Sequence, residues 1–360
     1  MSSLKTGIAT ATAAEQTVDA ARSPYPPGWP HLLLRAVERL PGPTWIVSVA
    51  LGLIVALVTH LPGWWRGDAP VGTLDPTSSY WGLLAGSLLW VLGYLERVAS
   101  RAFDAVRPAL SPSVGDPERL RYELTTAPRI PSLAAALLAT LLTVATLVSD
   151  PASSDVDRVP GPLFVAVLMA QAFMVSLLFV VLYQLIRQMR LIRRTLDRHV
   201  VVDIFRPGPL HAFPRLMATS GASLVLLAAP SVVPTVQTAG GNVLAWAPYV
   251  LLPPVIAVIA FIVPLYGTHQ RLAAEKERLA DEAEERLRGL LREINRDIDA
   301  RDLAGLDPLD RALASVMRQR EIVAKLSTWP WSAGTARGFA SAILLPLGLY
   351  LVQRLLSQLV

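Results

Sequence analysis

Seven long runs of apolar residues divide this chain of 360 residues, and they constrain its fold more than any other feature. A helix of about 20 apolar residues can cross a hydrocarbon core of about 30 Å, because all of its backbone hydrogen bonds are made internally. We therefore expect an all-α, polytopic membrane protein with seven transmembrane helices. The runs cover 44–61, 80–95, 132–149, 162–186, 216–236, 243–266 and 338–360.

The composition of the chain is typical of a membrane protein and excludes several kinds of chemistry. Only 17% of the residues are charged, against about 25% in an average soluble domain, and the mean hydropathy is +0.44. Cysteine is absent, which excludes disulfides, thiolate metal sites and cysteine nucleophiles together. Residues 1–43 lack the pattern of a signal peptide. We expect them to form a cytoplasmic tail that ends in a short amphipathic helix, HLLLRAVERL.

Basic residues fall almost entirely on one side of the predicted membrane, and they set the orientation. If the amino terminus is cytoplasmic and all seven runs cross, 30 of the 33 Lys and Arg residues lie inside. Only Arg66, Arg158 and Arg354 then lie outside. Because short loops rich in Lys and Arg stay in the cytoplasm, we predict an N-in, C-out topology. The same arginines account for the pI near 9.7 without a nucleic-acid partner.

The preference for arginine over lysine indicates the kind of genome that encodes this chain. Only Lys5, Lys276 and Lys325 are lysine, and Ala, Val and Leu are abundant. This bias is typical of a GC-rich, bacterial genome. We therefore expect a multi-pass protein of a bacterial cytoplasmic membrane, with the lipid bilayer as its first partner.

A strongly charged segment separates the sixth and seventh apolar runs. From Arg271 to Asp302, 18 of 32 residues are charged, and the apolar residues among them recur at spacings of three, four and seven. This is the period of an amphipathic helix. A second helix is expected over 308–326. Because apolar stripes have to be covered, we expect the two helices to bury theirs against each other or against another copy, in a cytoplasmic body. The candidate packing residues are Leu279, Leu287, Leu291 and Ile298.

Two of the predicted spans continue beyond the membrane as helix. The run at 162–186 extends to Val200, and the run at 243–266 extends into the charged segment, with Gly267 and Thr268 as a place where it could bend. The predicted domains are the tail 1–43, a six-span bundle 44–266, a cytoplasmic helical hairpin 267–337 and the final transmembrane helix 338–360.

No catalytic motif occurs in the chain. The patterns of nucleotide-binding loops, zinc proteases and nucleophile-elbow hydrolases are absent, and the five histidines are isolated in sequence. No charged residue lies in the middle of an apolar run, whereas proton-coupled transporters and pumps usually need such groups. We predict that the protein is not an enzyme, and we predict no cofactor and no metal site.

Neutral polar side chains remain inside the apolar runs, and two interpretations of them stay open. Threonine recurs every three residues along 132–149, and Ser176 lies in the fourth run. Such groups either hydrogen-bond neighbouring helices, as is common in membrane bundles, or line a hydrated pore or ligand cavity. In the final run, Tyr350, Gln353 and Ser357 share one helical stripe and are the candidate pore-lining residues.

The arrangement of these segments resembles that of the insect odorant and gustatory receptor superfamily of ligand-gated cation channels. The matching features are the N-in, C-out topology, the extension 187–200, the helices 269–302 and 308–326, and the final span. The resemblance implies a cytoplasmic helical base where four subunits meet. It covers most of the chain, but in topology only. The gustatory pattern of Thr-Tyr, four apolar residues and Gln-Phe is not kept, because only two residues separate Tyr350 from Gln353.

A second resemblance is carried by the segment TWPWSAGTARGFASAILLPLGL, residues 328–349, which is similar to an uncharacterised bacterial multi-pass membrane family. Two functions therefore stay open. One is an oligomeric ligand-gated ion channel whose last span lines the pore, with an unknown small-molecule ligand. The other is a non-conducting membrane sensor or scaffold whose cytoplasmic helices bind a partner.

Overall fold

The computed structural model describes residues 24–111, 116–149, 160–199, 204–205, 208–231, 243–300 and 306–359. Every regular element in these ranges is a helix, and the β-type pairing is limited to an isolated bridge between Pro27 and Pro128. The prediction of an all-α fold is confirmed. The main helices are α2 (Trp29–Glu38), α3 (Thr44–Arg66), α4 (Pro76–Val106), α5 (Pro117–Thr125), α6 (Arg129–Ser149), α8 (Gly161–His199), α9 (Ala212–Ala228), α11 (Val243–Asp299), α12 (Leu306–Lys325) and α13 (Ala333–Leu359).

Five helices of the described chain are long and apolar enough to cross a membrane, as judged by length and composition. They match five of the seven runs and are compatible with a multi-pass membrane protein. The run at 216–236 corresponds to α9, which has 17 residues, and its last residues lie outside the described ranges. The five are Thr44–Arg66, Pro76–Ala109, Arg129–Thr146, Gly161–Arg198 and Leu251–Asp299. The count of seven and the orientation stay predictions.

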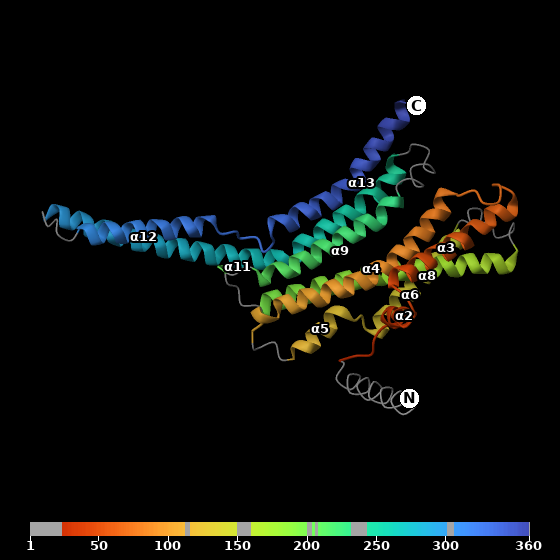
Figure 1. The fold of residues 1–360 in the computed structure, drawn as a ribbon, viewed down its shortest axis with the longest axis horizontal. Helices are drawn as coiled ribbons and strands as arrows, with labels where there is room; N and C mark the ends of the chain where they lie inside the picture. Colours follow the sequence, from red (N-terminus) through yellow and green to blue (C-terminus); the bar gives the residue numbers. More distant parts are fainter. Residues whose placement is uncertain are drawn as a thin grey trace.

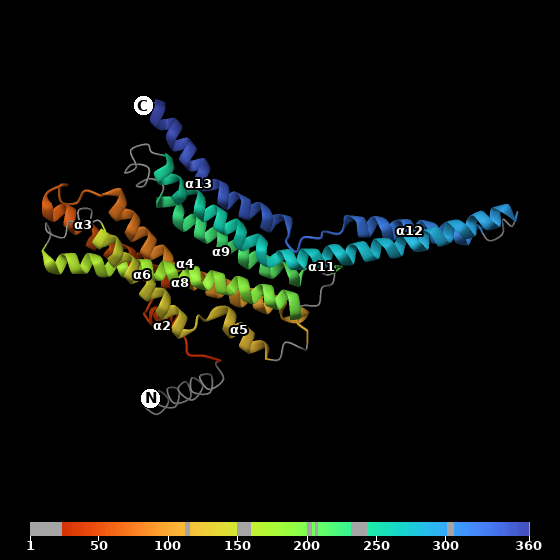
Figure 2. The same ribbon diagram turned by 180° about the vertical axis from the view of Figure 1, so that it is seen from behind.

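The helices form two groups that pack along α4 (Figures 1 and 2). In the first group, α3, α4, α6 and α8 lie together with the short helices α2 and α5. In the second, α9, the first half of α11 and α13 lie side by side. One core, with Leu88 and Leu177, joins α2, α3, α4, α8 and α9. The other, with Phe103, Phe213 and Leu265, joins α4, α5, α8, α9, α11 and α13.

Small residues set the close approach of α3 and α4. A Cβ atom built on Gly82 would lie 2.5 Å from the Cβ of Ala56, and one built on Gly86 would lie 2.6 Å from the carbonyl oxygen of Ser48. Neither distance is compatible with a real side chain, so glycine is required for this packing, as at other closely packed membrane helices. Asp75 begins α4 by accepting a hydrogen bond from the backbone N–H of Ser78, and Pro76 follows it at the first helical position.

The two long helices predicted from the apolar runs are both continuous. α8 has 39 residues, and α11 has 57 and is about 85 Å long at 1.5 Å per residue. α11 does not break at Gly267 and Thr268, and the end of α8 packs against it there. A Cβ on Gly267 would lie 2.8 Å from the Asp197 carboxylate, and Arg271 Nη1 donates to the Leu196 carbonyl at 2.7 Å.

The charged half of α11 and the helix α12 form a hairpin that projects away from the other helices (Figures 1 and 2). The second hairpin helix, predicted at 308–326, is confirmed at Leu306–Lys325. Lys276 Nζ donates to the carbonyls of Ala324 and Leu326 at 2.7 and 2.8 Å, which satisfies the carboxyl end of α12. Beside it, the rings of His269 and Trp329 are stacked with centroids 3.8 Å apart. These contacts fix the base of the hairpin.

Candidate functional site

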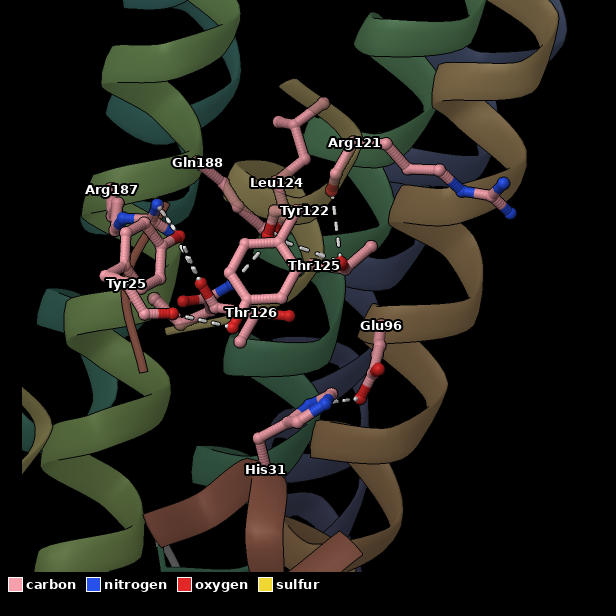
Figure 3. A network of polar contacts seen from close by, with 11 residues as sticks. Tyr25, His31, Glu96, Arg121, Tyr122, Leu124, Thr125, Thr126, Arg187 and Gln188 are labelled. Carbon is pink, nitrogen blue, oxygen red and sulfur yellow. Dashed lines mark hydrogen bonds and ion pairs between the residues drawn. The ribbon is translucent and has the colours of Figure 1, made fainter. Parts of the chain in front are cut away.

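Among the residues that the structure describes, the most connected polar site lies where the carboxyl end of α5 meets α8 and the extended segment before α2 (Figure 3). The last carbonyls of a helix have no partner within that helix. Here they are satisfied by side chains from α8 and from Tyr25. We call Tyr25, Gln184, Arg187 and Gln188 the α5 clamp.

The α8 part of the clamp comes from one helical face. Gln184, Arg187 and Gln188 are spaced i, i+3 and i+4, so they point in one direction. Arg187 Nη1 donates to the carbonyls of Glu123 and, at 2.9 Å, Thr126. The Nε2 atoms of the two glutamines donate to the Leu124 carbonyl, at 3.2 Å from Gln184 and 3.0 Å from Gln188. A cation at this end of α5 is also favoured by the helix dipole.

Tyr25 ties the segment before α2 into the same clamp. Its hydroxyl donates to the Thr126 carbonyl at 2.8 Å and accepts from Arg187 Nη2, and the guanidinium lies over its ring, 5.3 Å from the centroid. Tyr122 donates back to the Tyr25 carbonyl at 2.9 Å. Burial raises the pKa of Tyr25 to about 12, and the positive charge of Arg187 opposes only part of that shift. Tyr25 is therefore a neutral hydrogen-bond donor at ordinary pH.

A cavity adjoins the clamp, and we call it the polar chamber. Its inner part has a volume of about 20 Å³ and is lined by Gln184 and Gln188. Its outer part has a volume of about 250 Å³. Both parts are lined by His31, Leu34, Glu96 and Thr125.

Two kinds of polar group lie at or near the border of the polar chamber, whose inner part has a mostly apolar lining. His31 Nδ1 lies 3.4 Å from Glu96 Oε2, so an ionisable pair borders both parts. The Oε1 atoms of Gln184 and Gln188 are buried without a hydrogen-bond partner in the described structure, and the two residues are 6% and 1% exposed. Buried amide oxygens of this kind usually have a partner.

A second cavity is an open groove of about 670 Å³ between α3 and α4. Its lining is almost entirely apolar and includes Trp45 and Trp90, with His60 at one end. His60 is 4% exposed, accepts from the backbone N–H of Asp75 at 3.1 Å and lies 2.6 Å from the Ala56 carbonyl through Nδ1. Nδ1 therefore carries the proton. Both ring nitrogens are used to hold the α3–α4 turn.

The predicted packing stripe of the hairpin is only partly covered within one chain. Leu279 and Leu287 are half-buried, whereas Leu291 is 42% and Ile298 is 51% exposed. α12 covers the neighbouring face of α11, where Ala283 is 4% exposed. Burial of Leu291 and Ile298 against another copy stays a prediction.

The other predicted polar residues have different outcomes. Tyr350, Gln353 and Ser357 belong to α13, but their side chains lie outside the described residues. Ser176 does reach a neighbouring helix, since its hydroxyl donates to the Ala136 carbonyl of α6 at 3.3 Å. The threonines of α6 do not donate to a neighbouring helix among the described contacts, because their hydroxyls donate to carbonyls of α6 itself. The donors are Thr140, Thr143 and Thr146.

Sequence reasoning missed the α5 clamp. Its signal is the segment QLIRQ at 184–188, which places two carboxamides and a guanidinium on one face of a helix near the end of an apolar run. Their target, the carboxyl end of α5, is about 60 residues away and cannot be inferred from this spacing. No group of three or more potential metal ligands occurs among the residues that the structure describes. Comparison of the chain with family models, curated proteins and solved structures finds no match.

Proposed function

We propose that this protein is a non-conducting membrane scaffold whose α11–α12 hairpin pairs in the cytoplasm with the hairpin of a second copy. The observation that carries the proposal is the apolar surface on the projecting hairpin. On α11, Leu291 and Ile298 are 42% and 51% exposed, and on α12, Met317 and Ile322 are 58% and 50% exposed. Covering one such side chain contributes about 1.5–3 kcal/mol, which favours a partner along this surface.

The charges of the hairpin favour a second copy as that partner. Residues 275–299 of α11 carry nine acidic and six basic side chains, a net charge of −3. Residues 306–325 of α12 carry three acidic and four basic side chains, a net charge of +1. A two-fold axis allows an arrangement in which α11 of each copy lies against α12 of the other. The more acidic helix then faces the more basic one twice.

A change of the exposed residues tests this pairing. The double variant Leu291→Glu, Ile298→Glu places two charges on the uncovered surface, while Asn295→Glu adds one at an exposed position between them. The full-length protein is purified in detergent and its mass is measured by light scattering. We expect an oligomer for the wild type and for Asn295→Glu, and a monomer for the double variant. A wild-type monomer at all concentrations contradicts the proposal.

A measurement of conductance distinguishes the scaffold hypothesis from the channel hypothesis that the insect-receptor resemblance implies. The protein is reconstituted into planar bilayers, and the current is recorded with and without Gln353→Leu. We expect no current from either protein. A wild-type current that changes in conductance or ion preference in the variant would support a pore lined by α13 in place of the scaffold.

The proposal includes the N-in, C-out topology with seven spans, because the hairpin and the basic loops then share the cytoplasm. A reporter that is active only outside the cytoplasm is fused at Val360, and one active only inside is inserted near Ala300. We expect both to be active. Activity of the Ala300 reporter with a silent Val360 reporter removes the seventh span and leaves the hairpin cytoplasmic.

A further inference from the structure

The two ends of α2 are held at the beginnings of α6 and α3, two helices that are long and apolar enough to cross a membrane. At its amino end, Trp29 Nε1 donates to the carbonyl of Ser132, in the first turn of α6, at 3.2 Å. At its carboxyl end, residues 39–43 are all that separates α2 from α3. α2 therefore lies along the boundary where both helices begin, and across the direction of α4 and α8 (Figure 1).

One flank of α2 faces the other helices and fixes its rotation. Pro30, Leu34 and Val37 are buried, and they share this flank at about 100° per residue. A Cβ atom built on Gly93 of α4 would lie 3.4 Å from Leu34 Cδ2, so the helices are in contact there. The directions of the two remaining flanks follow from this contact.

The second flank is apolar and is turned toward the apolar runs. Trp29 and Leu32 share it, and Leu40 continues it just beyond the helix. Leu32 and Leu40 are 52% and 50% exposed. The ring of Trp29 packs on Phe173, in the apolar half of α8, with the ring centroids 6.2 Å apart. If α8 crosses the membrane, this flank faces the hydrocarbon side of the boundary.

The third flank is charged and is turned the opposite way. His31, Arg35 and Glu38 border the outer part of the polar chamber together with Thr125 of α5. α5 has nine residues, which is too short to cross a membrane. Arg35 and Arg39 are exposed. Around the helix, both arginines come between the apolar flank and Glu38, at the level expected for lipid head groups.

The beginnings of the two neighbouring helices extend the exposed apolar surface. In α6, Ile130 and Leu133 are 80% and 48% exposed, and in α3, Trp45 and Ile46 are 55% and 47% exposed. These residues belong to helices that can cross a membrane. A helix with an apolar flank and arginines beside it is typical of a segment that lies in the membrane interface. This surroundings favour lipid over a soluble protein as the partner of α2.

We propose that α2 lies in the interface of the bilayer and binds anionic phospholipids. Leu32 and Leu40 enter the upper part of the acyl chains, while Arg35 and Arg39 bind the phosphates of the head groups. An anionic leaflet attracts basic side chains close to its surface, and a guanidinium can donate two parallel hydrogen bonds to one phosphate.

The first experiment measures the depth of each flank. Because the chain has no cysteine, Leu32→Cys and Glu38→Cys each carry a single nitroxide label. The full-length protein is placed in nanodiscs of phosphatidylcholine and phosphatidylglycerol. Collisions of the label with oxygen, which concentrates among acyl chains, and with a water-soluble nickel chelate are measured by electron paramagnetic resonance. Leu141→Cys, at a position of α6 that is 58% exposed, gives the reference for the acyl layer.

The two labels should differ in the reagent that reaches them. We expect oxygen to reach the label at position 32 better than nickel does, as at position 141, and nickel to reach the label at position 38 better. Equal access of nickel to positions 32 and 38 overturns the proposal. A label at position 32 that is shielded from both reagents also overturns it, because another protein chain then covers the apolar flank.

The second experiment tests the anionic head groups. Hydrogen exchange of the α2 amides is compared in nanodiscs of phosphatidylcholine alone and in nanodiscs that also contain phosphatidylglycerol. We expect phosphatidylglycerol to raise protection by about fivefold for each arginine at the surface, and less in high salt. Equal protection of the wild-type α2 in both lipids overturns the proposal.

A pair of matched variants assigns that lipid effect to α2. The double variant Arg35→Gln, Arg39→Gln removes both charges at exposed positions, and Arg318→Gln, Arg320→Gln makes the same change at exposed positions of α12. We expect the first variant to lose the added protection by phosphatidylglycerol and the second to keep it. Retention of the full lipid effect in the α2 variant contradicts the role of the two arginines.

Discussion

The α5 clamp and the α11–α12 hairpin hold their helices with two different kinds of polar contact. In the clamp, side chains of α8 reach main-chain carbonyls about 60 residues away, and Gln184 and Gln188 are buried. On the hairpin, most ion pairs join residues three or four apart on one helix, and both partners are exposed. The clamp therefore specifies tertiary structure, whereas the hairpin pairs support a helix that would be solvated in one chain.

The comparison predicts large effects of substitution in the clamp. Arg187→Met removes the donor to the carbonyls of Glu123 and Thr126 and leaves them without that partner. Loss of hydrogen bonds to a charged group costs about 1.5–3 kcal/mol, so we expect the largest loss of stability here. Thermal unfolding in detergent measures it. The control is Arg190→Met, a change of the same type at an exposed position three residues further along α8. Equal effects of the two changes would show that the clamp adds nothing.

An intermediate loss of stability is expected from a substitution at a side chain that the hairpin partly buries. Leu287 is half-buried on the face of α11 that α12 approaches, and Glu285 is exposed. Leu287→Asp should destabilise the hairpin by about 1–2 kcal/mol, since burial of a leucine contributes about 1.5–3 kcal/mol when complete. Glu285→Gln should be neutral. Hydrogen exchange of the α11 and α12 amides measures both, and similar protection in both variants would contradict the predicted packing.

The contrast between local contacts on the hairpin and long-range contacts in the clamp also explains which features could be predicted from the sequence. The apolar runs and the 3.6-residue period predicted α8, α11 and α12 well, because those signals are local. The sequence could not say how much of Leu291 and Ile298 is covered within one chain, since periodicity identifies an apolar face but not how much of it a single neighbour covers. The clamp and the polar chamber were missed because they depend on where the carboxyl end of α5 lies. That position is set by tertiary packing alone.

A smaller loss of stability is expected from substitution of Tyr25, and its size depends on pH. Tyr25→Phe removes the hydrogen bond to Thr126 and should cost about 1 kcal/mol near pH 7. The pKa of Tyr25 is raised from 10.0 to about 12 in the folded protein. Between these values the unfolded chain loses the phenolic proton while the folded one retains it. The stability contributed by the hydroxyl is thus complete below pH 10 and declines as pH rises toward 12.

The difference in thermal unfolding midpoint between wild type and Tyr25→Phe measures this effect. It should be constant from pH 7 to 9 and shrink above pH 10. A Tyr25 difference that grows above pH 10 would contradict the raised pKa.

The smallest effect is expected from the ion pairs on the outer surface of the hairpin. Glu284 Oε1 lies 2.7 Å from Arg288 Nη2, and the two side chains are 48% and 70% exposed. A surface pair at this spacing contributes about 0.3–0.5 kcal/mol and is screened by salt. Glu284→Gln should therefore lower hydrogen-exchange protection in α11 slightly in dilute buffer and not at all in about 1 M salt, where the Debye length is about 3 Å.

Arg187→Met should keep its full effect on stability at both salt concentrations, because the guanidinium of Arg187 binds carbonyls within the clamp and not a solvated carboxylate. Equal salt dependence of the two variants would remove the distinction between the clamp and the hairpin on which the comparison depends.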